Sequence, residues 1–426
     1  MEKTYICIIK QNGFRLIMKN CIIYTFLAIT LLCSCGEDRT YEYLELTQEN
    51  QWIFEKMQEK YLWNDSIKTP KRQNFFAKSS TFFNDLLQRG DRYSHFNDST
   101  LSTSYGIKYA LYRDPLGKQS SRYYALVRFV EPGSPAEDAG LKRGDWIDQV
   151  GRNRLTSSNY GYLDRGNATT ISTCSIELNE ENMEYQWVAG DTLQMEAATE
   201  LHSTDLYFSD IYTQRNHQIG YIVCNNFAES GLNRLTATLD NFRQQQITDL
   251  VIDLRYNNGG SIAAANEFAN GIVSPTNNGK TFCTLTYNSL NSSNDTVYKY
   301  TASPNSLAME QVYIICGANT RGAAEALISS LRATLGYNNA IIIGETTYGE
   351  SFVTEAITSP YNFTINPATA IIGNDDGEPA FTQGITPTYT LNEFADFYKI
   401  YPLGDKQEYI LYNIFYHIIN GTFPQE

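Results

Sequence analysis

The sequence predicts an α/β protein built from several domains. The chain has 426 residues, enough for two or three domains. Its second half alternates short apolar runs with segments of helical spacing, the pattern of strand–loop–helix units around a parallel sheet. Residues 101–200 are mainly β in pattern, whereas Asn50–Trp63 and Phe75–Leu87 place apolar side chains at helical spacing. The expected order is therefore a helical region, a β domain and an α/β core.

The stretch Val312–Glu350 contains the clearest strand–loop–helix unit. Val312–Cys316 is an apolar run typical of a buried strand, and Ala323–Leu331 has helical spacing. A second apolar strand, Ala340–Ile343, leads into the loop Gly344–Glu350. Because α/β proteins bind their ligands at the carboxyl ends of such strands, we expect functional residues in these loops.

The same scheme precedes and follows this stretch. We expect buried strands at Gln218–Phe227 and Asp249–Tyr256, each followed by a helix. Residues 276–310 are expected to form an irregular insertion or an edge hairpin, and two apolar runs after residue 350 are expected to continue the sheet. The expected helices are Leu232–Gln246, Ser261–Ile272 and, near the end of the chain, Gln407–Ile419.

Two short segments of the central stretch resemble a peptidase family. Thr320–Glu325 reads Thr-Arg-Gly-Ala-Ala-Glu, and Gly344–Glu350 reads Gly-Glu-Thr-Thr-Tyr-Gly-Glu. They are similar to Thr-Ala-Ser-Ala-Ser-Glu and Gly-Glu-Thr-Thr-Tyr-Gly-Lys of the C-terminal processing (tail-specific) peptidases, which use a serine–lysine dyad. The resemblance covers residues 50–425 and implies a ClpP/crotonase-like core. It places Gly322 at the serine position and Glu350 at the lysine position, so it implies that the dyad is lost.

Serine–lysine chemistry needs a hydroxyl nucleophile and a neutral amine that accepts its proton. Gly322 has no side chain, and a carboxylate at position 350 does not replace a lysine on equal terms. A relocated nucleophile stays open, although we expect Thr320 to cap the helix that follows it. A cysteine in an apolar strand is usually an inert core residue. The residues considered for a relocated nucleophile are Thr320, Ser329, Ser330, Ser351 and Cys316.

The glycines that follow the strand Asp249–Tyr256 form a second motif. In the family that the chain resembles, the matching glycine amides act as an oxyanion hole, so the resemblance assigns Gly259 and Gly260 to this role. Asn258 stands where the family has another glycine. Backbone donors aimed at a developing oxyanion contribute about 3 kcal/mol to catalysis. A tight turn that requires positive φ explains the same glycines without a catalytic role.

The charged residues and cysteines elsewhere in the chain bear on structure, on metal binding and on nucleic-acid binding. Asp253 and Arg255 lie inside a buried strand pattern and are expected to pair structurally, because buried charges are seldom left alone. No Cys-x-x-Cys pattern occurs, so zinc is not suggested. We expect no metal and no other cofactor. The net charge of −14 makes nucleic acid an unexpected partner, because an acidic surface repels phosphate.

Residues 125–155 carry the most specific pattern of the β region. Ser134–Glu137 is a helix start, with Ser as N-cap, Pro at the first helical position and Glu three residues after the cap. With its flanking strands, this segment resembles a PDZ domain, which captures extended peptides at an open sheet edge. The resemblance assigns Tyr105, Gly106 and Ile107 to peptide binding, as the loop that holds a terminal carboxylate. The alternative interpretation makes Gly106 an ordinary turn or bulge residue.

The N-terminus predicts export. Ile22–Leu32 is apolar but too short for an ordinary spanning helix, which needs about 20 residues. Leu32–Gly36 resembles a bacterial lipoprotein cleavage box and predicts lipidation of Cys35. The alternative is an ordinary secretory signal with a chance cysteine. Residues 1–17 precede Met18–Asn20, which would make a standard charged start.

These observations define four segments and one leading hypothesis. The segments are a lipoprotein signal (1–35), a tether with an N-terminal helical domain (36–100), a PDZ domain (101–202) and a peptidase-like core with a C-terminal helix (203–426). We predict an exported lipoprotein, anchored to a bacterial cell-envelope membrane on its periplasmic or surface side, that binds extended peptides or protein C-termini and cleaves them little or not at all. One alternative is an active serine-type endopeptidase with a relocated nucleophile that degrades exported proteins. Another is a structural or glycan-related surface lipoprotein whose PDZ groove is unused.

Overall fold

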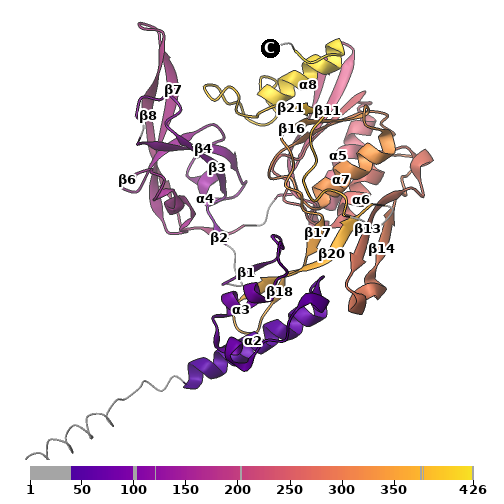
Figure 1. The fold of residues 1–426 in the computed structure, drawn as a ribbon. Coiled ribbons are helices and arrows are strands. Elements are labelled where there is room, and N and C mark those ends of the chain that lie inside the picture. The colour runs from indigo at the N-terminus through magenta and orange to yellow at the C-terminus, as the bar shows by residue number, and fades with distance from the viewer. Residues whose placement is uncertain are drawn as a thin grey trace, which may run out of the picture. The chain divides into compact units, whose positions relative to one another are not determined.

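The computed structural model describes residues 40–98, 103–119, 121–201, 204–374, 377 and 379–424 (Figure 1). Cys35 and the rest of the expected signal lie outside the described residues. The chain divides into two compact units: residues 40–56 with Lys68–Leu87, and Met57–Ile67 with the described residues from Gln88 onward. Within the described residues, no helix is both long enough and apolar enough to cross a membrane.

The first unit is helical, as the spacing of its apolar residues predicts. The side-chain amide of Asn50 donates to the carbonyls of Phe75 (3.0 Å) and Ala77 (2.8 Å), which ties the long helix to the segment beside it. Its apolar side chains are buried, among them Ile53, Phe82 and Phe83. Its elements are α2 (Thr40–Lys60), of which residues 57–60 belong to the second unit, the 3-10 turn η2 (Arg72–Phe76) and α3 (Ser79–Leu86).

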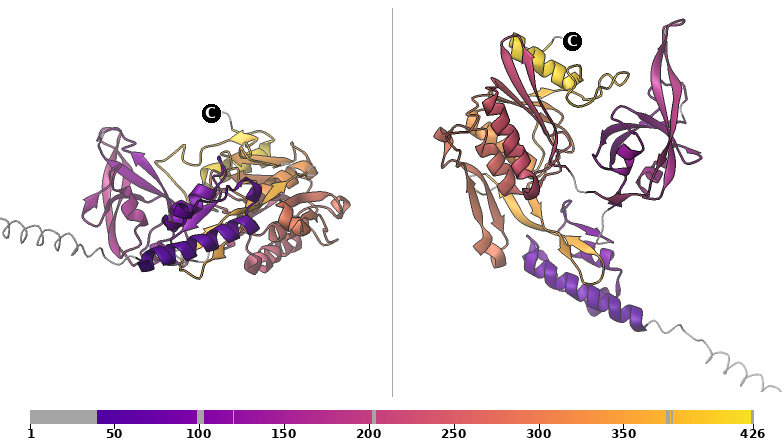
Figure 2. Two further views of the ribbon diagram at one scale, coloured as in Figure 1. Left: turned by 60° about the horizontal axis from the view of Figure 1, so that its bottom comes forward. Right: turned by 180° about the vertical axis from the view of Figure 1, so that it is seen from behind.

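The second unit contains a β domain whose main sheet has the strand order β3-β4-β5-β7-β8, with β6 beside β5. The predicted helix start is confirmed, because Ser134 Oγ accepts the Glu137 amide at 3.2 Å at the start of α4. The right-hand view of Figure 2 shows β7 and β8 as a long hairpin. The elements are β2 (Thr103–Ser104), β3 (Ile107–Arg113), β4 (Tyr123–Val130), α4 (Pro135–Asp138), β5 (Trp146–Val150), β6 (Asn153–Arg154), η3 (Tyr160–Asp164), β7 (Thr169–Asn179), β8 (Glu184–Met195) and β9 (Thr199–Glu200).

The α/β core is organised around a sheet of order β10-β11-β12-β15-β16-β21, in which only the β10–β11 pair is antiparallel. Helices α5, α6 and α7 pack over one apolar cluster on one face of the sheet. Helix α8 packs over a second cluster on the other face (Figure 1). The alternating strands and helices predicted from the sequence are confirmed. Their bounds are β10 (Leu206–Gln214), β11 (His217–Cys224), α5 (Leu232–Gln244), β12 (Asp249–Asp253), α6 (Ile262–Asn270), β15 (Val312–Cys316), α7 (Ala323–Leu335), β16 (Ala340–Gly344), β21 (Tyr389–Thr390) and α8 (Tyr409–Asn420).

The two apolar runs that were expected to continue this sheet, residues 352–358 and 368–372, do not join it, so that expectation is wrong. Strands β17 and β20 instead join the hairpin from residues 281–299 in a separate antiparallel sheet of order β14-β13-β20-β17. A small sheet, β1-β19-β18, lies in the same unit. The bounds are β1 (His95–Asn97), β13 (Thr281–Tyr287), β14 (Thr296–Lys299), β17 (Phe352–Thr354), β18 (Ile357–Thr358), β19 (Thr364–Asn366) and β20 (Ala368–Gly373).

Candidate active site

The loops that follow β12, β15 and β16 meet at the carboxyl ends of these parallel strands. They line a cavity of about 430 Å³, which we call the cleft. Gly259, Gly260, Gly322 and Glu350 all line it, so the structure brings together these residues, which the sequence motifs singled out. The edge strand β17 and His95 of β1 complete its walls. The placement agrees with the rule that α/β sheets carry their sites at this edge.

Gly322 lies at a sharp elbow between β15 and α7. Its backbone has φ 56° and ψ −116°, a conformation that costs a residue with a side chain about 1–3 kcal/mol. Strand-to-helix elbows of this kind carry nucleophiles in hydrolases. A Cβ built on Gly322 would lie 3.6 Å from Glu350 Oε2 and 3.7 Å from Gly259 Cα. The elbow therefore has room for a side chain, and that side chain would face Glu350.

Glu325, in the first turn of α7, holds the loop after β16 against the elbow. One of its carboxylate oxygens accepts the amides of Gly322 (3.1 Å) and Glu350 (2.7 Å). The other accepts the Gly349 amide at 2.6 Å and the Thr347 hydroxyl. Burial raises the pKa of Glu325, and these hydrogen bonds oppose that shift. One buried carboxyl thus fixes the shape of both motif segments.

The glycine loop presents one free amide to the cleft. Both glycines have positive φ, as the tight-turn interpretation requires. The Gly259 amide donates to Asn257 Oδ1 at 2.8 Å, so it is occupied within the chain. The amides of Gly260 and Ala323 have no acceptor among the described residues, and both residues line the cleft. The structure thus favours Gly260 and Ala323 as the donor pair, and the motif comparison missed Ala323, the residue after the elbow.

Glu350 is a carboxyl group without a partner. Its side chain makes no hydrogen bond or ion pair with the described residues. Burial raises the pKa of Glu350 to about 7, against the opposing charge of Arg321 and with the help of Glu325. The Arg321 guanidinium lies over the Tyr348 ring at 4.9 Å, and its buried Nε has no hydrogen-bond partner. The cleft thus offers both a hydrogen-bond acceptor and hydrogen-bond donors that the chain does not use.

Lys108, on β3 of the β domain, reaches the rim of the cleft. Its Nζ donates to the Tyr256 carbonyl at 3.0 Å and to Asn258 Oδ1 at 3.2 Å. Burial lowers the pKa of Lys108 to about 8, with Glu131 opposing the shift and Arg321 adding to it. No motif marks this residue, because it approaches the cleft from a strand 150 positions earlier in the chain.

None of the residues considered for a relocated nucleophile lines the cleft. Thr320 Oγ1 donates to the Leu254 carbonyl at 2.7 Å, so the expectation that Thr320 caps α7 is wrong. Ser330 bonds the Tyr300 hydroxyl at 2.7 Å, and buried Ser351 accepts the Phe381 amide. Ser329 does not line the cleft, and burial raises the pKa of the Cys316 thiol. Thr354 on β17 is the one hydroxyl side chain among the described residues that line the cleft.

The residues assigned to peptide binding lie at the start of β3. Tyr105 is buried, and its hydroxyl donates to the Asn167 carbonyl. The Gly106 amide donates to Ser104 Oγ at 3.0 Å, and a Cβ at Gly106 would lie 2.2 Å from Ser134 Cβ. Close packing therefore requires a glycine at this position, as the turn interpretation implies. Ile107 begins β3, whose outer edge is unpaired within the described residues.

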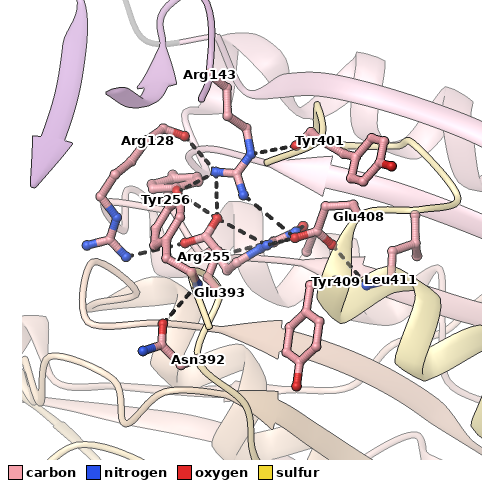
Figure 3. Close-up of polar contacts among 12 residues, drawn as sticks. Arg128, Arg143, Arg255, Tyr256, Asn392, Glu393, Tyr401, Glu408, Tyr409 and Leu411 are labelled. Atoms are coloured by element: carbon pink, nitrogen blue, oxygen red, sulfur yellow. Dashed lines mark hydrogen bonds and ion pairs between the residues drawn. The ribbon is translucent and has the colours of Figure 1, made fainter. Parts of the chain in front are cut away.

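A second polar cluster, none of whose residues lines the cleft, surrounds buried Arg255 (Figure 3). Arg255 donates to Asp253, to Glu393 at 3.1 Å and to Glu408 at 2.7 Å. Arg143 of the β domain lies 2.6 Å from Glu393. The expectation that Asp253 and Arg255 are structural partners is confirmed. This cluster also ties the β domain to the C-terminal segment of the core.

Comparison with known proteins identifies the family. The model of the peptidase S41 N-terminal domain matches residues 48–95, and the model of peptidase family S41 matches residues 218–391. The chain therefore belongs to peptidase family S41, in agreement with the motifs at the cleft.

The individual matches are more distant. The carboxy-terminal processing protease CtpA of Bacillus subtilis is 25% identical over 331 residues, covering 74% of this chain and 65% of CtpA. CtpB of the same organism is 22% identical over 322 residues, covering 74% of this chain and 63% of CtpB. The chain thus spans less than two thirds of the length of either relative. A crystal structure of a putative S41 protease from Bacteroides fragilis has a TM-score of 0.75 at 24% identity, covering 87% of this chain and 97% of that one, and shows the shared fold.

Proposed function

We propose that this chain is an exported lipoprotein of peptidase family S41 that binds extended peptides or protein C-termini and hydrolyses them slowly or not at all. The observation that carries the proposal is the chemistry of the cleft. Elbow, free amides and glycine loop are in place, yet Gly322 supplies no oxygen and position 350 supplies no amine. Among the described residues that line the cleft, none is a serine, a cysteine or a lysine.

Two edge strands support the peptide-binding part of the proposal. On one side β17 pairs with β20, and on the other, where it lines the cleft, it is unpaired within the described residues. An extended peptide can add to such an edge through main-chain hydrogen bonds. In the β domain, which we interpret as a PDZ domain, the outer edge of β3 offers a second place. There the Tyr109 hydroxyl bonds Asp164 of η3 at 2.8 Å, so the groove beside β3 is bridged.

The decisive experiment restores the two missing groups. The double variant Gly322→Ser/Glu350→Lys is incubated with an unfolded protein, and the fragments are measured by mass spectrometry beside the wild type. We expect no cleavage above background by the wild type. In the double variant we expect a cleavage rate at least about 100-fold above that background, the lower range for a positioned proton acceptor. The matched control is Gly322→Ala/Glu350→Lys, which has the same lysine and elbow strain but no hydroxyl. Cleavage by the wild type that disappears on removal of one hydroxyl would overturn the proposal.

An active peptidase with a relocated nucleophile is the second candidate. Two observations favour it: Thr354 lines the cleft, and Lys108, whose pKa burial lowers to about 8, bonds Asn258 at its rim. A lysine that loses its proton near neutral pH is a suitable general base. A serine-reactive fluorophosphonate probe separates the candidates. Labelling of the wild type that is lost in Thr354→Val and in Lys108→Met would establish this candidate, and absence of labelling would remove it.

A further inference from the structure

The cleft presents hydrogen-bonding groups of both kinds within one cavity. The free amides of Gly260 and Ala323 require an acceptor, and Ala323 begins the 13-residue helix α7, whose positive end adds to this preference. The unpartnered carboxyl of Glu350 faces the same space, within 3.6 Å of where a side chain at Gly322 would begin. An ionised carboxylate only accepts hydrogen bonds, so it requires a donor. A ligand that satisfies all of these groups must offer an acceptor and a donor side by side.

The charges around Glu350 narrow the class of ligand. Arg321 lines the cleft and disfavours an ammonium group, whereas an ionised Glu350 disfavours a carboxylate. Glu325 adds negative charge, but its four hydrogen bonds are all made within the chain. His95 of β1 also lines the cleft. A neutral amide, whose C=O accepts and whose N–H donates, is compatible with both signs of charge.

Two further cations lie close to this arrangement. Arg92, on the segment before β1, donates to the Thr382 carbonyl at 2.9 Å and lies over the Tyr348 ring. Lys108 is held on the Tyr256 carbonyl and Asn258. Both are therefore oriented by neighbours of the cleft, and Glu350 is the carboxyl that faces its interior without a partner.

We propose that the cleft holds a neutral amide, normally an internal peptide bond of an extended segment lying along β17, and that it admits a free C-terminal carboxylate only when Glu350 is protonated. In the bound state the peptide C=O accepts from Gly260 and Ala323, and the peptide N–H donates to Glu350. This inference rests on the proposed function and specifies its ligand. The ligand of the cleft then differs from the ligand expected at the edge of β3, which is the C-terminal end of a chain.

The pH at which the preference changes follows from the burial of Glu350. Because burial raises the pKa of Glu350 to about 7, the group is mostly protonated at pH 5.5 and mostly ionised at pH 8. A protonated carboxyl donates a hydrogen bond to a carboxylate, whereas an ionised one repels it. If a free acid requires the protonated form, its affinity falls about tenfold by pH 8, one unit above that pKa.

The experiment uses the full mature chain and two fluorescent peptides of one sequence, both N-acetylated, one ending in a carboxamide and the other in a free acid. Dissociation constants are measured by anisotropy at pH 5.5 and pH 8. For the wild type we expect the free acid to lose about tenfold in affinity on going to pH 8, whereas the carboxamide changes less than about threefold. In Glu350→Gln we expect the two peptides to respond alike to pH.

Two control variants and the outcomes complete the design. Glu355→Gln removes an exposed carboxylate just beyond β17 and should leave the wild-type pattern intact. His95→Gln removes the imidazole from the cleft wall and should also keep the difference between the peptides. Equal binding of the two peptides at both pH values, or a pH dependence that survives in Glu350→Gln, overturns the inference but leaves peptide binding in place. If neither of the two peptides binds at any pH, the proposed function itself is overturned.

Discussion

Two glutamates of the same structural unit, the buried Glu393 and the partly buried Glu350, have opposite environments. Glu393 accepts the Tyr256 hydroxyl at 2.7 Å and lies within 2.6 Å of Arg143 and 3.1 Å of Arg255. Burial alone would raise its pKa, but the surrounding arginines hold the pKa of Glu393 at about 2. Glu350 has no such partner, and burial raises its pKa to about 7.

The difference separates the structural role of Glu393 from the binding role that we propose for Glu350. Each oxygen of Glu393 has an arginine partner inside the protein, so its charge is fixed and nothing remains for a ligand. Glu350 lines a cavity, and its charge changes near neutral pH. A carboxyl whose pKa is perturbed by burial and that faces a cavity is a candidate for function. The predictions below test this contrast, beginning with the largest expected effect.

Removal of the charge of Glu393 should destabilise the fold strongly. In Glu393→Gln, Arg143 and Arg255 lose a buried counter-charge, and loss of one member of a buried pair costs about 3–5 kcal/mol. Urea unfolding at pH 7 measures the change, with the exposed Glu355→Gln as the matched control. A loss below about 1 kcal/mol would mean that Asp253 and Glu408 neutralise the arginines without Glu393.

Acid should weaken the same cluster over a defined range of pH. The pKa of Glu393 in the fold is about 2, below its ordinary value of 4.5, so its contribution is complete above pH 4.5 and declines as the pH falls towards 2. This shift corresponds to about 3 kcal/mol of the free energy of unfolding. Unfolding curves at intervals from pH 6 to pH 2 should show the decline in the wild type. Glu393→Gln should decline less, and equal slopes would assign the acid sensitivity to other carboxyls.

Glu350→Gln should stabilise the fold, and by a smaller free energy of unfolding than Glu393→Gln removes. The pKa of Glu350 is raised from 4.5 to about 7, so stability is complete below pH 4.5 and is lost as the pH rises through 7. Glutamine removes this loss, so we expect the free energy of unfolding of the variant to exceed that of the wild type by about 1–3 kcal/mol at pH 8 and not at pH 4. Thermal unfolding at both pH values measures it. A loss at pH 8 would show that Glu350 has a partner in solution.

Local patterns predicted the core strands well, whereas long-range pairing did not follow from them. The predicted strand Val312–Cys316 has the bounds of β15 because all of its residues are buried and apolar. The apolar runs at residues 352–358 and 368–372 were assigned to the wrong sheet, because β20 pairs with β13, about 85 positions earlier in the chain. Such pairing depends on contacts that no local pattern encodes.

The site shows the same division. The motifs located the elbow and the loop after β16, because the spacing around Gly322 and Glu350 is retained. Lys108 and His95 could not be predicted, since they reach the cleft from other parts of the chain. The occupied amide of Gly259 was also unpredictable, because it depends on the rotamer of Asn257.

The hydrogen bonds of Glu325 bear on how such a protein evolves. All four of its donors are backbone amides or the hydroxyl of Thr347, and none is a side chain at position 322 or 350. The loop architecture is thus insulated from the identity of the reactive groups. Exchange of the side chains at positions 322 and 350 would therefore leave these hydrogen bonds in place, and a glycine at position 322 also avoids the strain of the elbow.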